Sequence, residues 1–360
     1  MLNRLGVNYV VQFLDDHPVK NKFMKFTFSF DHSDENYLEE QKFIREPYSI
    51  REVDLYEFWY SGIYIDALTG AVLDKQQRIQ ISSLKYPSLI PSTYLSRIDH
   101  IDKSFEKSNQ QFYFLPSFST EYYHLWFDGL IYLYFLSLKK EVFTVLIPNN
   151  TTAKVKEILY LFQDEFNFVT LKSRFIQLPN LLKFSHVSLD KDTPLITNEM
   201  AEFFKLKVVS KKKNIKTFDR IFIGRRDSKT RLIKNDMKIK SILYNFGFKV
   251  IYLEDYSIIE QAFIFNNAEI IAGLHGAGFT DLIFCNKKTK VIEFHNYLNI
   301  TNYFAISKQL DLEYHYILPF EFNFDEIEDP YNKTDKYYRQ KLKNTSFDPN
   351  VLIKLLEDIT

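Results

Sequence analysis

Cysteine is almost absent from this chain, since Cys285 is the only one among 360 residues. A single thiol excludes an internal disulfide framework and a metal site built from cysteines. Net charge is absent as well, because 46 lysines and arginines balance 46 aspartates and glutamates. No overall field therefore attracts nucleic acid or an acidic membrane, and any anion site must be local.

The N-terminal region lacks a long hydrophobic run. Its apolar segment, Val7–Leu14, is interrupted by Asn8 and Gln12, and no small-residue cleavage site follows. The segment is too short and too polar for a membrane span, so we expect a cytoplasmic protein. Hydrophobic residues still make up 46% of the chain. That is enough for two cores, and the length favours two domains.

The stretch from Arg220 to Phe294 carries most of the functional information. Amphipathic helical patterns alternate there with four apolar runs typical of buried strands, namely Arg220–Gly224, Phe248–Leu253, Glu269–Ala272 and Lys290–Phe294. Gly247 ends one predicted helix, Asp236–Phe246, and Ser257 begins the next, Ile258–Asn267. Strands and helices that alternate in this way predict βαβ units and a parallel sheet.

Polar residues and glycines follow these predicted strands, at the edge of a parallel sheet where ligands bind. The first strand leads into Arg225 and Arg226, the third into the turn His275–Gly278, and the fourth supplies Glu293. Glycines let backbone N–H groups approach an anion, arginines clamp phosphate, and a carboxylate at such an edge commonly holds a ribose. The sequence therefore predicts a site for a nucleotide diphosphate.

The order of these elements resembles the donor-binding half of glycosyltransferase family 61, as found in bacterial members. The resemblance is carried by Gly224-Arg225-Arg226-Asp227, Arg231, Asn235-Asp236, Gly247-Phe248, Glu260-Gln261, His275-Gly276-Ala277-Gly278, Phe284 and Glu293. This chain departs from the family at two points. It has Asp236 where the family has Glu, and Thr280-Asp281 where Thr-Asn is usual.

The resemblance implies an inverting glycosyltransferase of the GT-B type, in which two Rossmann-like α/β domains face each other and the second binds a nucleotide-sugar donor. The acceptor would be a glycan or glycolipid, as in capsule or lipopolysaccharide synthesis. The implied donor-binding residues are Arg225, Arg226, Arg231, Asn235, His275, Gly276, Ala277, Gly278 and Glu293. Because arginines and glycine amides can neutralise the departing diphosphate, we expect neither a metal nor a cofactor.

A second candidate site lies between Leu115 and Leu138. Ser119 or Thr120 is placed to cap a helix on which His124 and Asp128 lie one turn apart. The family has Tyr-His-Trp-Leu-x-Asp here, whereas Leu and Trp are exchanged in this chain. We predict that Asp128 is the catalytic base and that His124 orients it or acts itself. His275 is the rival base, and a core histidine satisfied by a carboxylate is the structural alternative.

The remaining patterns set the domain limits. Residues 53–73 predict strands with turns at Ser61-Gly62 and Thr69-Gly70. Further on, Val142–Pro148 predicts a strand, Thr152 begins a helix, and Asn167–Leu171 opens a second βα unit. We expect an N-terminal α/β domain over 1–205, a nucleotide-sugar domain over 206–325, and a tail over 326–360. The last predicted helix of that tail, Asn350–Ile359, is expected to cross back to the first domain.

Other interpretations stay open at this point. Asp190-Lys191-Asp192 matches the Asp-x-Asp metal motif of another transferase fold, but no convincing strand precedes it and we interpret it as a loop. The lysine-rich run 204–216 is predicted to be a solvated connection, with peripheral contact to anionic lipid as the alternative. A nicotinamide-dependent oxidoreductase, a non-catalytic phosphate-binding protein and an interaction protein are the competing classes.

Overall fold

The computed structural model describes residues 13–14, 19–29, 50–67, 70–75, 79–80, 100–115, 122–185, 194–209, 215–226, 230–295, 302–320 and 344–360. Ser119, Thr120, the Asp190–Asp192 motif and residues 210–214 of the lysine-rich run lie outside these ranges. The chain divides into two compact units. Described residues up to 26 and from 53 to 185 belong to the first unit, whereas 27–29, 50–52 and everything from 194 onward belong to the second.

The second unit contains a five-stranded parallel sheet. Its order is β11-β10-β12-β13-β14, and the strands are β10 (Arg220–Ile223), β11 (Lys249–Ile251), β12 (Ile270–Leu274), β13 (Lys290–Phe294) and β14 (Glu313–Ile317). All four strands predicted between Arg220 and Phe294 are thus confirmed. The second of them is shorter than predicted, because the chain turns into a short 3₁₀ helix at Leu253–Asp255.

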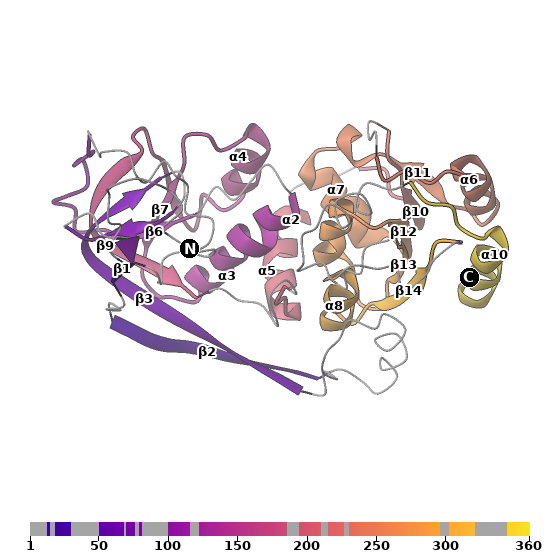
Figure 1. Cartoon of the computed structure of the whole chain (residues 1–360), viewed down its shortest axis with the longest axis horizontal. Coiled ribbons are helices and arrows are strands. Elements are labelled where there is room, and N and C mark those ends of the chain that lie inside the picture. Colours follow the sequence, from indigo (N-terminus) through magenta and orange to yellow (C-terminus); the bar gives the residue numbers. More distant parts are fainter. Residues whose placement is uncertain are drawn as a thin grey trace, which may run out of the picture. The chain divides into compact units, whose positions relative to one another are not determined.

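Helices cover both faces of this sheet (Figure 1). On one face lie α6 (Asp236–Asn245) and α10 (Pro349–Ile359), and on the other lie α7 (Ile258–Asn267) and α8 (Asn302–Gln309). Local sequence explains their ends. Gly247 has φ +79° after α6, and Ser257 and Glu260 form a reciprocal capping box at α7.

The structure bears on two predictions about the second unit, namely the course of its last helix and its boundary at residue 205. Helix α10 packs on the sheet of its own unit, where Leu352 and Leu356 are buried in the core, so the prediction that it crosses back to the first domain is wrong. The apolar face of α10 is buried against this sheet, so it does not need the first domain as a partner. Helix α5 (Asn198–Val208), which spans the predicted boundary at 205, contacts α7 and the 3₁₀ helix η9 (Ala277–Phe284).

The first unit is a mixed α/β unit built on a nine-stranded sheet. Its path is β1-β5-β4-β3-β9-β6-β7-β8 with β2 paired to β3, and the strands are β1 (Phe13–Leu14), β2 (Val19–Ser29), β3 (Ile50–Asp66), β4 (Val72–Leu73), β5 (Ile79–Gln80), β6 (Gln111–Phe114), β7 (Phe143–Ile147), β8 (Asn167–Thr170) and β9 (Phe175–Phe184). Strands β6, β7 and β8 are parallel, whereas β3, β4 and β9 pair antiparallel.

Two predictions for this unit are wrong. Ser61-Gly62 is not a turn, because β3 continues through it and Gly62, with φ +57°, lies opposite Pro179 of β9 in the strand register. A proline that cannot donate to the ladder and a glycine with positive φ together form a local irregularity within a long strand pair. Strand β8 is also followed by strand β9 and not by the helix of a second βα unit.

The helices of the first unit include one irregular segment. Helix α2 (Tyr122–Leu125) continues through a π-helical turn, Trp126–Leu130, into α3 (Ile131–Ser137). Helix α4 (Ala153–Tyr160) begins at Thr152, whose hydroxyl accepts from Val155 N as predicted. No helix within the described ranges has the length and apolar character needed to cross a bilayer.

Candidate functional site

The strand order of the second unit defines where a ligand should bind. Numbered along the unit, the order is 2-1-3-4-5, so the chain moves to opposite sides of β10 when it forms β11 and β12. In doubly wound sheets the ligand lies at this switch point, beyond the carboxyl ends of the two central strands. Ile223 of β10 is aligned with Gly273 of β12. Arg225 and His275, each two residues further on, therefore reach the same part of the edge.

Arg225 and the glycine turn are in direct contact. Nη2 of Arg225 donates to the carbonyl oxygen of His275 over 2.7 Å. A Cβ atom at Gly276 would overlap this guanidinium, and one at Gly278 would lie 2.9 Å from Leu253 Cδ1. Both glycines are thus required for close approach of the backbone to its neighbours. The predicted convergence of Arg225 with the His275–Gly278 turn is what the structure shows.

Arg231 brings a second positive charge close to Arg225. Burial, and next the charge of Arg231, lower the pKa of Arg225 to about 10, so this guanidinium is still cationic at neutral pH. Arg231 has φ +56°, and its Nε is buried without a hydrogen-bond partner in the described part of the chain. Within the same part, neither arginine forms an ion pair with a carboxylate. Two neighbouring cations that have no carboxylate partner among the described residues favour an anionic ligand.

Arg226 has a different environment from Arg225. Its guanidinium makes two hydrogen bonds to Asp255, of 2.9 and 2.8 Å, and lies 4.2 Å from the centre of the Tyr252 ring. Half of the side chain is exposed. Arg226 therefore interacts with the end of β11 and not with the His275 turn, which corrects the prediction that both arginines clamp the same group.

His275 belongs to a buried polar network on β12, β13 and β14. Its Nδ1 is hydrogen-bonded to Oε1 of Glu293, and the hydroxyl of Tyr314 donates to Oε2 of Glu293 over 2.5 Å. Nε2 of His295 lies 3.0 Å from the same hydroxyl. Burial alone would raise the pKa of Glu293, but the two histidines and these hydrogen bonds outweigh it and hold the pKa below its usual value.

Glu293 itself is 0% exposed, with both oxygens engaged inside the protein. Its expected role as a ribose ligand is therefore not supported, because the carboxylate orients His275 instead. Of the described residues, His275, Glu293 and His295 also form the one group of histidine and carboxylate donors compact enough to hold a metal ion. The expectation that no metal is needed stays a prediction.

Asn235 has a structural role in place of the expected donor contact. Its amide nitrogen donates to the carbonyl of Phe347 over 2.7 Å, and its amide oxygen accepts from Phe347 N over 3.2 Å. Gln261 is similar, since its Nε2 donates to the carbonyls of Leu253 and Tyr256. Both side chains thus hold backbone segments of the second unit in place.

Two tyrosines of the site were missed by the sequence analysis. Tyr314 reaches Glu293 from the neighbouring strand, and the ring of Tyr303 lies 5.2 Å from the ring of His275. Burial, first of all, raises the pKa of Tyr303, so its hydroxyl stays protonated beside the two arginines. No spacing rule could identify either residue, because both follow the last motif in the sequence and approach it only through the sheet and α8.

The second predicted pair forms in the first unit. His124 Nδ1 lies 2.7 Å from Asp128 Oδ2. Asp128 sits in the π-helical turn and is 8% exposed, whereas the His124 side chain is 40% exposed. Single π turns within α-helices occur frequently at functional sites. The predicted (i, i+4) pairing is confirmed, and the irregular turn that carries the carboxylate was not predicted.

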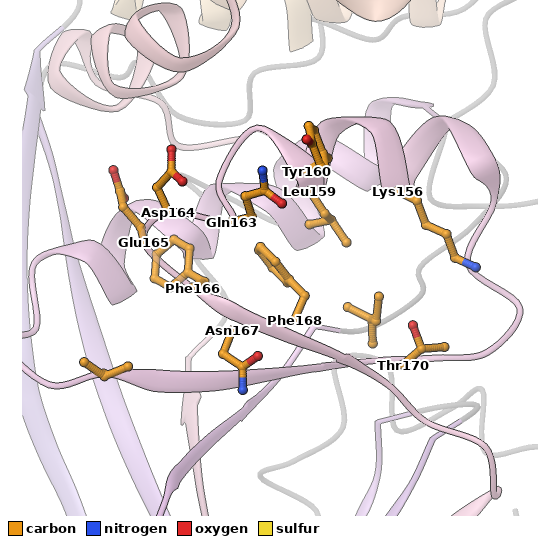
Figure 2. A pocket seen from close by; sticks show the side chains of 12 residues that line it. Lys156, Leu159, Tyr160, Gln163, Asp164, Glu165, Phe166, Asn167, Phe168 and Thr170 are labelled. Atoms are coloured by element: carbon orange, nitrogen blue, oxygen red, sulfur yellow. The ribbon is translucent and has the colours of Figure 1, made fainter.

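The first unit also has an open cavity of about 610 Å³ beside α4 and β8 (Figure 2). Its lining is mixed and includes Lys156, Tyr160, Glu165 and Phe168. Neither His124 nor Asp128 lines it. This cavity is therefore separate from the predicted residues of the first unit.

Comparison with known protein families identifies the class of this protein. Residues 122–292 match the family model described as Glycosyltransferase 61, a span that holds both the His124–Asp128 pair and the His275 turn. The protein is a glycosyltransferase. Residues 122–292 form a region of the glycosyltransferase family 61 type, as the motifs predicted.

Solved structures and curated sequences add little to this assignment. One similar chain is the dodecameric iron-containing heptosyltransferase TibC in complex with ADP-D-beta-D-heptose, with 12% identity, a TM-score of 0.39, and coverage of 85% of this chain and 93% of that one. Another is TibC from enterotoxigenic E. coli H10407, with 10% identity, a TM-score of 0.36 and the same coverage. Among curated proteins no sequence matches the chain.

Proposed function

We propose that this glycosyltransferase moves a sugar from a nucleotide-sugar donor to a glycan or glycolipid acceptor, with inversion and without a divalent metal ion. The observation that carries the proposal is the pair Arg225 and Arg231 beside the Gly276 turn, at the switch point of a parallel sheet. A diphosphate is the anion that suits two guanidinium groups and a set of backbone amides.

The donor-side residues would act on the leaving group. In glycosyl transfer the bond from the anomeric carbon to the diphosphate oxygen breaks, and negative charge develops on that oxygen. Arg225 is held by its hydrogen bond to the His275 carbonyl before a ligand arrives. We propose that it stabilises this charge together with Arg231 and the backbone N–H groups of Gly276–Gly278. In this proposal they supply the charge that a divalent cation supplies in metal-dependent transferases.

For the proton of the acceptor hydroxyl, we propose Asp128 as the base. Inversion by direct displacement requires one base on the acceptor side and no protein nucleophile. Asp128 lies in the π turn, and its hydrogen bond to His124 holds the carboxylate in one orientation. The proposal also assigns the two units to a GT-B arrangement, with the donor on the second unit and the acceptor and base on the first.

The biological setting follows from the resemblance to bacterial members of the family. We propose that the acceptor is a growing surface glycan, such as a capsule or lipopolysaccharide chain. The reaction would then take place in the cytoplasm or at the inner face of the plasma membrane.

Calorimetric titration of the purified protein with UDP, GDP, CMP, ADP and NAD tests the donor class. We expect one nucleoside diphosphate to bind with one site per chain, equally well in the presence of EDTA. A screen of nucleotide-sugars, read by mass spectrometry, would then identify the sugar. Binding of NAD alone would support an oxidoreductase, and nucleotide binding without transfer to any glycan acceptor would support a non-catalytic binding protein.

A further inference from the structure

The buried network around His275 has a definite direction of hydrogen bonding. The Tyr314 hydroxyl donates to Glu293, so the 3.0 Å contact between Nε2 of His295 and this hydroxyl places the donor on His295. Oε2 of Glu293 accepts this proton, so we treat the carboxylate as an acceptor in the network. The hydrogen bond between its Oε1 and His275 Nδ1 therefore requires the proton to be on Nδ1.

We propose that Glu293 and Tyr314 are positioning residues, which hold His275 in the tautomer with the proton on Nδ1 and thereby present the unprotonated Nε2 as an acceptor to a hydroxyl group of the donor. The identity of that ligand rests on the proposed function. The tautomer itself does not, since it follows from contacts within the protein.

The position of His275 supports this assignment. Its carbonyl oxygen accepts from Arg225, so the backbone of His275 is fixed by the same guanidinium that we assign to the diphosphate. Its ring packs between Tyr303, at 5.2 Å, and His295, at 6.1 Å, and cannot rotate freely. His275 is 6% exposed, and within the described residues its Nε2 makes no hydrogen bond. A ring fixed on three sides with its second nitrogen unused is suited to contact a ligand.

Glu293 has no such opening, because it is fully buried. Tyr314 is partly exposed, but its hydroxyl donates its proton to Oε2 of Glu293. We therefore assign the effect of both residues on a ligand to their hold on His275. A carboxylate that selects the tautomer of an imidazole can control catalysis without contacting substrate.

A metal ion held by His275, Glu293 and His295 is the competing interpretation of the same side chains. A metal bound to Nδ1 of His275 would replace the proton there. The two interpretations thus make opposite predictions for a single nitrogen atom, and one measurement can separate them.

The test is nitrogen NMR of the full chain, with histidine rings labelled with ¹⁵N, at a pH where the histidines are neutral. His275→Gln identifies the His275 signals by their loss. In the unsubstituted protein we expect Nδ1 to be protonated and Nε2 unprotonated. In Glu293→Gln and Tyr314→Phe we expect loss of this fixed pattern, with a larger change in the first variant.

Matched controls are Glu269→Gln, an exposed carboxylate at the opposite end of β12, and Tyr244→Phe, an exposed tyrosine on α6. Neither should change the His275 signals. Thermal unfolding of each variant checks that it is folded, and Tyr314→Phe keeps the test valid if Glu293→Gln does not fold.

A proton on Nε2 of His275 in the unsubstituted protein would overturn the proposal. So would signals that both variants leave unchanged, or one tightly bound metal ion per chain by elemental analysis that is lost in Glu293→Gln. Failure to find a donor would overturn the proposed function but would leave the NMR result standing. Once a donor is known, Glu293→Gln should lower kcat more than it raises KM, which a merely structural role would not predict.

Discussion

The two units of this glycosyltransferase carry their candidate residues in different ways. In the second unit, Arg225 and the His275 turn follow directly from the ends of parallel strands, so neighbours in the sheet bring them together. In the first unit, His124 and Asp128 meet within one turn of a helix, and a π-helical irregularity sets the place of the carboxylate. The first arrangement depends on tertiary pairing and the second on local geometry. Substitutions should therefore affect binding in one unit and chemistry in the other.

Asp128→Asn tests this division most strongly. The amide keeps the size of the side chain but cannot accept the acceptor's proton. We expect kcat for transfer to fall about 10²- to 10⁴-fold, the contribution typical of a general base, while the affinity for the nucleoside diphosphate stays the same. Steady-state kinetics and calorimetry measure the two quantities. Asp164→Asn, an exposed residue of the same unit, is the matched control, and full turnover in Asp128→Asn would refute the assignment of the base.

The next largest effect is expected for a substitution in α10, which packs on the sheet of the second unit. Leu356 is 0% exposed in the core between α10 and the sheet. Leu356→Ala should lower the free energy of unfolding of the second unit by about 2–5 kcal/mol, because it removes buried methyl groups and leaves a cavity. Val351→Ala, on the exposed side of the same helix, should change it little. Denaturant unfolding followed by a nucleotide-binding signal would show whether α10 stabilises the donor-binding unit.

The sequence allowed most of the second unit to be predicted, for a physical reason. Buried parallel strands read as continuous apolar runs, and helix ends carry local signals such as Gly247 and Ser257. Strand pairing in the first unit depends on residues more than 100 positions apart, such as Ser61 and Asn180. Nothing local distinguishes a glycine in a turn from Gly62, which lies opposite a proline within a long strand pair.

The residue types of the site were also predictable, but their partners were not. Glu293 was expected to meet a ribose because it ends a strand, yet Tyr314 on the next strand occupies one of its oxygens and His275 the other. Arg225 and Arg226 are adjacent in sequence and equal in charge. Only the tertiary structure shows that Asp255 pairs with the second of them.

Arg225→Ala should weaken binding more than any other change of a single donor-side charge. It removes a cation at the switch point and releases the His275 carbonyl. We expect a loss of about 10- to 150-fold in nucleoside diphosphate affinity, since a hydrogen bond to a charged group contributes about 1.5–3 kcal/mol. Calorimetry with the diphosphate found in the donor screen measures it. An unchanged affinity would remove the main support for the proposed donor site.

Arg226→Ala is the matched neighbour and should have the smallest effect. The side chain is half exposed and is already paired with Asp255, so a ligand would have to compete with an existing ion pair for it. Exposed ion pairs contribute little, and we expect the affinity to change by no more than about fivefold. If Arg226→Ala instead weakens binding as much as Arg225→Ala, the ligand must draw Arg226 away from Asp255. Asp255→Ala should then strengthen binding, because it releases the guanidinium, and the same calorimetric titration would show it.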